Sequence, residues 1–328
     1  MSMRDNGMAL SVVIPVYRSA GCLPELARQL AATLDGLARP YEILLVDDAS
    51  PDESWSVIED LARQYPRLAA VRLMRNYGQH QATLFGLALA RGDIVVTMDD
   101  DLQQPPDQIP LLLRALAERP DMDAAIGCYR VKRHGWFRNL GSALIRALNR
   151  RAFNLPRDLC SSSFRALRRP VVDSLVRWRT RNPALAAMIY QTTRRIVNVP
   201  VAHAVRFAGC SNYTLYRQAR MALDYLCNVS LLPLHAMAVA GFGFCLFSVA
   251  FVIRTLHRYY ADHIDVEGWT SLIIMVSLSA GLILLSLGVI GEYIVRILRE
   301  VQGAPRCQER QRAGWIAPAR ADNAGGGI

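Results

Sequence analysis

Short apolar runs alternate with amphipathic stretches over the first hundred residues. The apolar runs have strand length and occupy residues 10–17, 42–46, 69–74 and 93–98. The stretches between them have helical spacing and occupy residues 23–37, 55–64 and 79–90. Strands that alternate with helices are typical of a parallel sheet covered by helices. The pattern therefore predicts an α/β fold with a mostly parallel sheet and flanking helices.

Acidic residues follow two of the predicted strands. Asp47-Asp48 closes the second strand, and Asp99-Asp100-Asp101 closes the fourth. Ligands of parallel sheets bind beyond the carboxyl ends of the strands. Asp99 and Asp101 suit Mg²⁺ or Mn²⁺, which takes one or two carboxylates and completes its shell with water and phosphate oxygens. The alternative is that the acidic triplet serves only as turn and helix-cap residues, as the following Pro105-Pro106 suggests.

The last third of the chain contains two uncharged apolar segments. Residues 229–253 and 272–290 carry no formal charge, and about 20 apolar residues are needed to cross a hydrocarbon core of about 30 Å. We predict two C-terminal transmembrane helices; a pair of buried core helices is the alternative. The resulting domains are an α/β domain, a membrane domain and a disordered basic tail, at residues 1–220, 221–300 and 301–328.

The charges that flank these segments predict their orientation. The loop at residues 255–269 holds one arginine and three acidic residues, whereas six arginines follow the second segment. Positive charge marks the cytoplasmic side, although Arg254 acts against this assignment. The polar start of the chain does not resemble a signal peptide. We therefore expect a multi-pass protein of the cell membrane, with the α/β domain and both termini in the cytoplasm.

Composition narrows the class of protein. The 328 residues are 52% hydrophobic, which excludes disorder for most of the chain, and the net charge is +10. Seven cysteines without a C-x-x-C pair favour reduced thiols in a reducing compartment. The chain has no nucleic-acid-binding signature, which argues against nucleic acid as a partner. It also has neither the dinucleotide-binding G-x-G-x-x-G nor a P-loop, so a dehydrogenase or an NTPase is unsupported.

Six motifs carry a family resemblance. They are VVIPVY (12–17), EILLVDDASPD (42–52), NYGQH (76–80), GDIVVTMDDDLQQPP (92–106), RFAGCSNY (206–213) and GEYIVRI (291–297). In this order they resemble family-two glycosyltransferases with a GT-A fold, in particular the membrane enzymes that load a sugar onto a polyprenyl phosphate. Dolichol-phosphate mannose synthases, bactoprenol glucosyltransferases and undecaprenyl-phosphate aminoarabinose transferases are all similar. NYGQH is most similar to the last group.

The resemblance implies a nucleotide-sugar site near the acidic residues. Pro15 and Tyr17 would line the base pocket. The acidic pair Asp47-Asp48 would hold uracil and ribose. The remaining implied roles are Asp99 in the ribose or metal shell, Asp101 on the cation and Gln103 facing the donor sugar.

The resemblance also implies a site for phosphates. Arginine suits phosphate because its planar fork reaches two oxygens and stays charged. The residues concerned are Arg130, Arg133, Arg206, Ser211 and Tyr213. Asp158 is a candidate catalytic residue, but it stands seven positions before Arg165, and Ser163 occupies the place of an acid in some relatives. The identity of any base is open, and an ionised phosphate acceptor hardly needs one.

The implied activity is that of an inverting, metal-dependent glycosyltransferase. It would move a sugar from a UDP-linked donor to undecaprenyl or another polyprenyl phosphate, for cell-envelope glycan or lipid modification, and would act as a homo-tetramer. One alternative is a membrane glycosyltransferase with a protein or polysaccharide acceptor. A second is a catalytically inactive homologue that scaffolds a membrane assembly, against which the intact Asp99, Asp101, Arg206 and Ser211 argue.

Two further features leave alternatives open. The basic amphipathic stretch at residues 136–152 fits a helix in the membrane interface or one packed on the catalytic domain. His80 is either a catalytic imidazole or a residue that positions a loop.

Overall fold

The strands and helices of the catalytic part follow the predicted alternation. The computed structural model describes residues 9–129, 160, 162–178, 180, 183–202, 232–262, 268–301 and 307–314. Their contacts divide them into two units, one built around a β-sheet and one containing two long helices. The first elements are β1 (Leu10–Val16), α1 (Leu23–Asp35), β2 (Tyr41–Asp47), α2 (Ser54–Gln64), β3 (Leu68–Leu73), α3 (Gln79–Leu89) and β4 (Ile94–Thr97).

The second half of the sheet unit is less regular. Its elements are the 3₁₀ turn η1 (Pro106–Gln108), α4 (Ile109–Glu118), β5 (Ala124–Tyr129), β6 (Arg165–Arg168), α6 (Arg169–Arg177), α7 (Leu185–Thr192), β7 (Ile196–Val201) and β8 (Glu309–Ala313). The predicted amphipathic helix at residues 136–152 lies outside the described residues.

All eight strands form one sheet in the order β7-β5-β6-β4-β1-β2-β3-β8. The pairs β1–β2, β1–β4, β2–β3 and β5–β7 are parallel, whereas β6 and β8 pair antiparallel with their neighbours. This confirms the prediction of a mostly parallel sheet. From β1 the chain winds outward through β2 and β3 and then returns to the other side of β1 with β4. Such a reversal opens a crevice at the carboxyl ends of the two strands.

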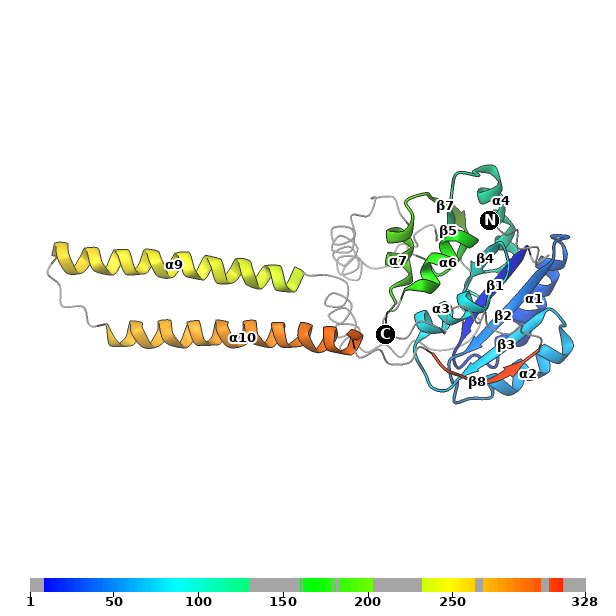
Figure 1. Cartoon of the computed structure of the whole chain (residues 1–328), viewed down its shortest axis with the longest axis horizontal. Helices are drawn as coiled ribbons and strands as arrows, with labels where there is room; N and C mark the ends of the chain where they lie inside the picture. The colour runs from blue at the N-terminus through cyan, green and yellow to red at the C-terminus, as the bar shows by residue number, and fades with distance from the viewer. Residues whose placement is uncertain are drawn as a thin grey trace. The chain divides into compact units, whose positions relative to one another are not determined.

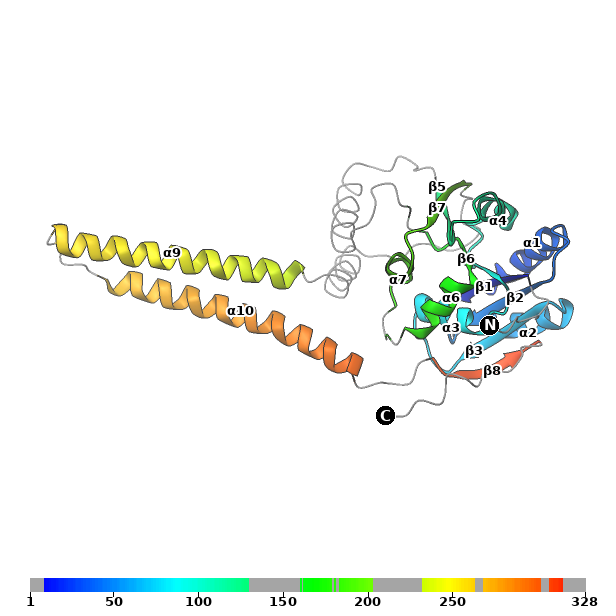
Figure 2. The ribbon, with the colours of Figure 1, turned by 45° about the horizontal axis from the view of Figure 1, so that its top comes forward.

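Helices cover both faces of the sheet (Figures 1 and 2). Alternate residues of each strand point to opposite faces. Val12 packs with α1, α2 and α4 in one buried cluster, and Val13 packs with α3, α6 and α7 in another. Helix α3 lies close to the strands at Gly86, where a Cβ would come within 2.4 Å of Val13 Cγ1. The beginning of α3 is thereby fixed beside the carboxyl ends of β1 and β4.

Strand β8 corrects the prediction of a disordered tail. Residues Glu309–Ala313 add an antiparallel strand to the free edge of β3, next to it in both ribbon views (Figures 1 and 2). Met74 N donates to Gln308 O at 2.8 Å, and Cys307 packs against the cluster of Val46 and Val71. The prediction is therefore wrong for residues 307–314, and also for Val301, which is the last residue of a helix. The rest of the predicted tail lies outside the described residues.

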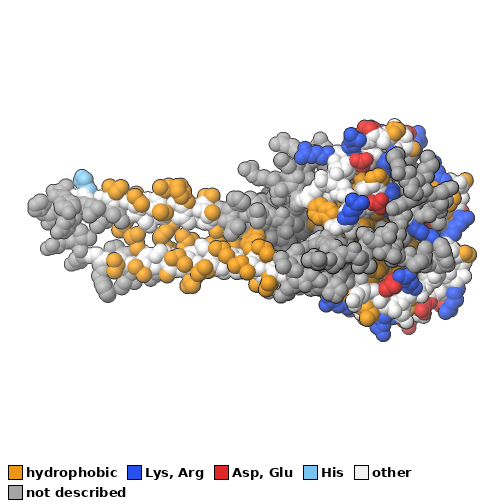
Figure 3. All heavy atoms as spheres, viewed as in Figure 1, with side chains coloured by type: hydrophobic (Ala, Val, Ile, Leu, Met, Phe, Trp, Pro, Cys, Tyr) orange, Lys and Arg blue, Asp and Glu red, His pale blue; other side chains and the backbone are white. Residues whose placement is uncertain are grey.

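The second unit contains the long helices α9 (Leu232–Asp262) and α10 (Trp269–Val301). Hydrophobic side chains are exposed along both of them (Figure 3). Among the described residues, one helical window, Leu278–Val295 in α10, is long and apolar enough to cross a membrane. The apolar stretch described in α9, Met237–Phe251, is shorter. One of the two predicted crossings is thus supported by length and composition, and the second is not confirmed.

Candidate functional site

The crevice between β1 and β4 brings together residues from both strand ends. Asp100, just after β4, accepts hydrogen bonds from Tyr17 N at 3.1 Å and from Ser19 Oγ at 2.5 Å. Burial raises the pKa of Asp100 to about 6. Asp100 therefore ties the turn after β1 to the acidic triplet. The sequence patterns singled out its neighbours in the D-x-D spacing but gave Asp100 no role.

Three side chains from separate parts of the chain hold Asp99. Gln79 Nε2 donates to Asp99 Oδ1, while Gln104 Nε2 and Ser163 Oγ donate to Asp99 Oδ2 at 2.9 and 2.6 Å. Gln104 Oε1 also accepts from Asp99 N at 2.9 Å, so this buried amide fixes both the main chain and the side chain of Asp99. Burial raises the pKa of Asp99. Sequence analysis missed Gln104, although it stands beside the predicted Gln103.

Asp101 lies at a sharp turn. Its Oδ1 accepts from Gln103 N at 3.1 Å, and Leu102 between them has a φ of 61°, in the left-handed region. Asp101 is half-buried. The described residues contain no cluster of three or more His, Cys, Asp or Glu side chains that could form a metal site alone. Two carboxylates nevertheless fit Mg²⁺ or Mn²⁺, because these ions take most of their ligands from water and phosphate.

The acidic pair after β2 lies in a different environment. Asp47 and Asp48 are 0% and 2% exposed, and burial raises the pKa of both carboxyls. The two oxygens of Asp48 accept from Tyr77 N and Gly78 N, each at 2.7 Å. Asp47 accepts from Ser50 N at 3.2 Å and has an oxygen 3.3 Å from Arg72 Nε. In the structure both side chains bind protein groups, and their contact with uracil and ribose stays a prediction.

The remaining predicted residues divide into two groups. Pro15 is buried within β1, and Tyr17 is 42% exposed at its end, where Arg18 lies 5.3 Å from the ring centroid. Tyr17 is thus accessible to a planar ligand. The other group lies outside the described residues, and its assigned roles stay predictions: Arg130, Arg133, Asp158, Arg206, Ser211 and Tyr213.

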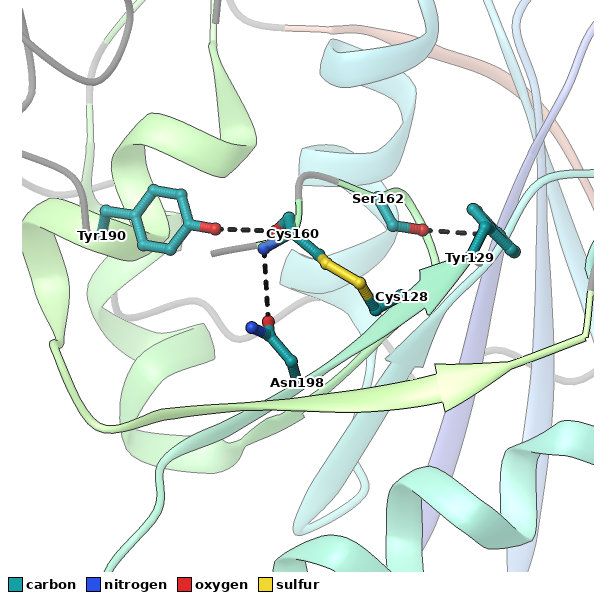
Figure 4. Close-up of a disulfide and its surroundings, with 6 residues drawn as sticks. All are labelled: Cys128, Tyr129, Cys160, Ser162, Tyr190 and Asn198. Carbon is teal, nitrogen blue, oxygen red and sulfur yellow. Dashed lines mark hydrogen bonds between the residues drawn. A yellow bond between two sulfur atoms is a disulfide. The ribbon is translucent and has the colours of Figure 1, made fainter. Parts of the chain in front are cut away.

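A disulfide links β5 to the segment that precedes β6 (Figure 4). Cys128, in β5, is bonded to Cys160, with their Cα atoms 5.5 Å apart. Cys160 O accepts from Tyr190 Oη at 2.9 Å, and Cys160 N donates to Asn198 Oδ1 at 3.3 Å. The expectation of reduced thiols is therefore wrong for this pair. Among the other described cysteines, Cys22, Cys245 and Cys307 form no disulfide.

Comparison with known proteins agrees with this architecture. The chain is similar to the undecaprenyl-phosphate 4-deoxy-4-formamido-L-arabinose transferase of Sodalis glossinidius (strain morsitans), with 35% identity over 302 residues that cover 90% of this chain and 91% of the relative. The protein of the same name from Enterobacter sp. (strain 638) is 34% identical over 301 residues, which cover 90% and 91% of the two chains.

A solved structure shows the same fold. Glucosyl-3-phosphoglycerate synthase from Mycobacterium tuberculosis, in complex with phosphoglyceric acid, superposes with a TM-score of 0.50 at 21% identity. The superposition covers 68% of this chain and 79% of that one. Residues 11–176, half of the chain, match the model of glycosyl transferase family 2. The sheet is GT-A-like, the carboxylate triplet lies where the strand order reverses between β1 and β4, and the relatives cover most of the chain. The chain therefore belongs to glycosyl transferase family 2.

Proposed function

We propose that this protein transfers a sugar from a UDP-linked donor to undecaprenyl phosphate with inversion of configuration. The observation that carries the proposal is the acidic triplet at the switch point between β1 and β4, next to the exposed Tyr17. The names of the relatives that span 90% of the chain supply the class of acceptor.

The described residues have separate tasks in this proposal. Tyr17 stacks on the base of the nucleotide, and Asp101 holds Mg²⁺ or Mn²⁺. The bound cation offsets the negative charge on the departing diphosphate. Gln79, Gln104 and Ser163 keep Asp99 in one orientation beside it, through the hydrogen bonds described above. Gln103 faces the donor sugar.

The acceptor attacks directly. A prenyl phosphate is ionised at neutral pH, so its oxygen bonds to the anomeric carbon while the bond to the diphosphate breaks, and no proton has to be removed. A single displacement of this kind inverts the anomeric centre. We assign the binding of the phosphates to Arg130, Arg133, Arg206, Ser211 and Tyr213, and an auxiliary role to Asp158.

Both long helices cross the membrane in this proposal. Strands β7 and β8 belong to one sheet, yet α9 and α10 lie between them in the chain. Two strands of one sheet lie on the same side of a membrane, so the chain between them crosses an even number of times. If α10 crosses, a second segment has to cross as well, and α9 with its exposed apolar side chains is the natural one. The arginine asymmetry supports a cytoplasmic position of the sheet in this proposal.

One assay tests the chemistry. The purified full-length protein is incubated with undecaprenyl phosphate, Mg²⁺ and a panel of UDP-sugars, and the products are identified by mass spectrometry and by NMR of the anomeric centre. We expect a β-linked lipid phosphosugar from an α-linked donor. Retention of configuration would refute direct attack, and transfer only to a protein or polysaccharide would refute the lipid acceptor.

A reporter fusion tests the topology. An enzyme that is active only outside the cytoplasm should give signal when inserted in the segment that connects α9 to α10, after Asp262 and before Trp269, and none when fused after residue 328. Signal at both positions would show that α10 does not cross the membrane and would contradict the two-crossing topology.

A further inference from the structure

The turn after β1 is held by side chains from two other parts of the chain. Four consecutive main-chain N–H groups of this turn, beginning with Tyr17 N, donate to side-chain oxygens. The last three donate to Ser50, Ser54 and Asp52, which lie between β2 and the start of α2. Tyr17 N donates to Asp100, in the acidic triplet that follows β4. The turn is therefore anchored to the ends of both strands that flank β1.

The turn after β1 and the turn after β4 each contain a strained residue. Arg18 has a φ of 57° and Leu102 has a φ of 61°, both in the left-handed region that non-glycine residues rarely adopt. Such backbone conformations persist only where the surrounding groups hold them. Asp100 joins the two turns, because its Oδ2 accepts from Tyr17 N at 3.1 Å and from Ser19 Oγ at 2.5 Å. A displacement of one turn is therefore transmitted to the other.

Each of the two turns carries one group of the proposed site. The exposed Tyr17 stacks on the base of the nucleotide, and Asp101 holds the cation. A nucleoside at Tyr17 has no charged group with which to bind the cation. Any effect of one ligand on the other therefore has to pass through the protein. Asp100 is suited to carry it, since its main chain adjoins Asp101 and its side chain binds the turn of Tyr17.

We propose that Asp100 is a positioning residue that couples the binding of the nucleobase at Tyr17 to the binding of the cation at Asp101. The inference rests on the proposed function, which assigns these two ligands to these two residues. A cation that fixes Asp101 also fixes the adjacent Asp100, and with it the turn that presents Tyr17. The nucleoside then loses less conformational freedom of the protein when it binds. Each ligand should therefore strengthen the binding of the other.

Uridine separates this coupling from direct contact, because it lacks the phosphates that would bind the cation. The Mn²⁺ affinity of the purified full-length protein is measured from the electron paramagnetic resonance of the free ion. The titration is made without uridine and with uridine at a concentration that displaces UDP. We expect uridine to tighten Mn²⁺ binding about 5-fold. By linkage, Mn²⁺ should tighten uridine binding by the same factor, which provides an internal check.

The decisive variant is Asp100→Ala, which removes the oxygen that accepts from Tyr17 N and Ser19 Oγ. The effect of uridine on Mn²⁺ affinity should fall below about 1.5-fold in this variant. The Mn²⁺ affinity itself should also fall, because a negative charge near the cation is lost. The readout is therefore the ratio of the Mn²⁺ affinities with and without uridine. A merely structural or electrostatic role would lower both affinities and leave their ratio unchanged.

Two further variants are matched controls. Asp100→Asn loses the charge but keeps an oxygen as acceptor, so it should retain a coupling of at least about 3-fold. Asp52→Ala removes the acceptor of Ala20 N, in the same turn but outside the triplet, and should keep the coupling of the wild type. If Asp100→Ala does not fold, Ser19→Ala takes its place. It removes one of the two hydrogen bonds to Asp100 and should lower the coupling to about 2-fold.

The outcomes separate the coupling from the proposed function. An unchanged ratio in Asp100→Ala, or in Ser19→Ala where it takes its place, would overturn the role of Asp100. An equal loss of coupling in Asp52→Ala would overturn it as well. If the wild type forms the lipid product but binds uridine and Mn²⁺ independently, the proposed function stands and the coupling fails. If the wild type binds neither UDP nor uridine, both proposals fail.

Discussion

Strands β2 and β4 flank β1, and consecutive aspartates stand at or just beyond the carboxyl end of each, but the two groups lie in opposite environments. The buried pair, Asp47 and Asp48, is almost fully enclosed, and its oxygens face main-chain N–H groups and Arg72. The triplet, Asp99–Asp101, is only half-buried and lines the crevice. Identical side chains therefore serve to shape loops in one place and to present charge in the other.

The difference follows from which groups the neighbouring loops supply. The loop before α3 brings Tyr77 N and Gly78 N to both oxygens of Asp48, and Gly78 adopts a φ of 91°, which glycine reaches without strain. The same loop continues to Gln79, which donates to Asp99. The buried pair thus supports the triplet through three consecutive residues, Tyr77 to Gln79. Substitutions in the buried pair should therefore change mainly the stability of the protein, and substitutions in the triplet mainly its activity.

The largest effect should come from Asp101→Asn. Losing the charge that holds the cation should lower the transfer rate about 1,000-fold, about 4 kcal/mol of barrier. The thermal midpoint of the purified protein should not change, because Asp101 contributes little to the core. Chelation should silence the wild type, and Mg²⁺ or Mn²⁺ should restore it. Asp107→Asn, at an exposed position, serves as the control. Full activity of the wild type in chelator would contradict a role for the cation.

Asp48→Ala should act on stability. Two N–H groups would lose a charged acceptor, so the free energy of unfolding should fall by about 2 kcal/mol, measured by urea titration. Asp60→Ala removes only an exposed ion pair with Arg63 and should cost less than about 0.5 kcal/mol. Equal urea midpoints for Asp48→Ala and the wild type would show that the buried pair does not support the loop.

Gln104→Leu should lower turnover less than Asp101→Asn does. It removes the amide that holds both the main chain and the carboxylate of Asp99, so turnover should fall about 10-fold, or about 1.4 kcal/mol. The Mg²⁺ concentration for half-maximal activity should rise as well, which distinguishes a displaced triplet from a general loss of folded protein. Gln108→Leu, in the neighbouring 3₁₀ turn, is the control. Normal Mg²⁺ dependence in Gln104→Leu would argue against positioning.

The smallest effect should come from Ser19→Ala. It removes one donor to Asp100 but leaves the hydrogen bond from Tyr17 N. We expect a loss of turnover of about 3-fold and a change in unfolding free energy below about 1 kcal/mol. A larger loss of stability than in Asp48→Ala would reverse the assignment of the two acidic groups.

The periodicity of the sequence was sufficient to predict the fold. It was not sufficient to predict which side chains contact one another in the site. The runs at residues 10–17 and 42–46 are apolar because both faces of β1 and β2 are covered by helices. The positions of the triplet follow from the strands. Ser163 and Asp99, by contrast, are 64 residues apart, and no local pattern shows that they meet.

The other features that the sequence analysis did not predict have similar physical explanations. Strand β8 reads Glu-Arg-Gln-Arg-Ala and lies exposed at the sheet edge, so it lacks the apolar alternation by which strands are recognised. The pairing of Cys128 with Cys160 depends on β5 and on the segment before β6 meeting in space. The burial of Asp47 and Asp48 depends on a loop from another strand. Non-local contacts decide each of these features.

Strand β8 also has a consequence for biosynthesis. It is separated from β7 by 107 residues that include both long helices, which a ribosome needs on the order of ten seconds to synthesise. During this interval the sequence Leu-Ala-Ala-Val-Arg-Leu of β3 is an uncovered, apolar edge strand, open to pairing with another chain. The sheet of the nascent protein can be completed only after α9 and α10 have been made, so a delay in the synthesis of these helices would prolong the period in which the sheet unit is prone to aggregation.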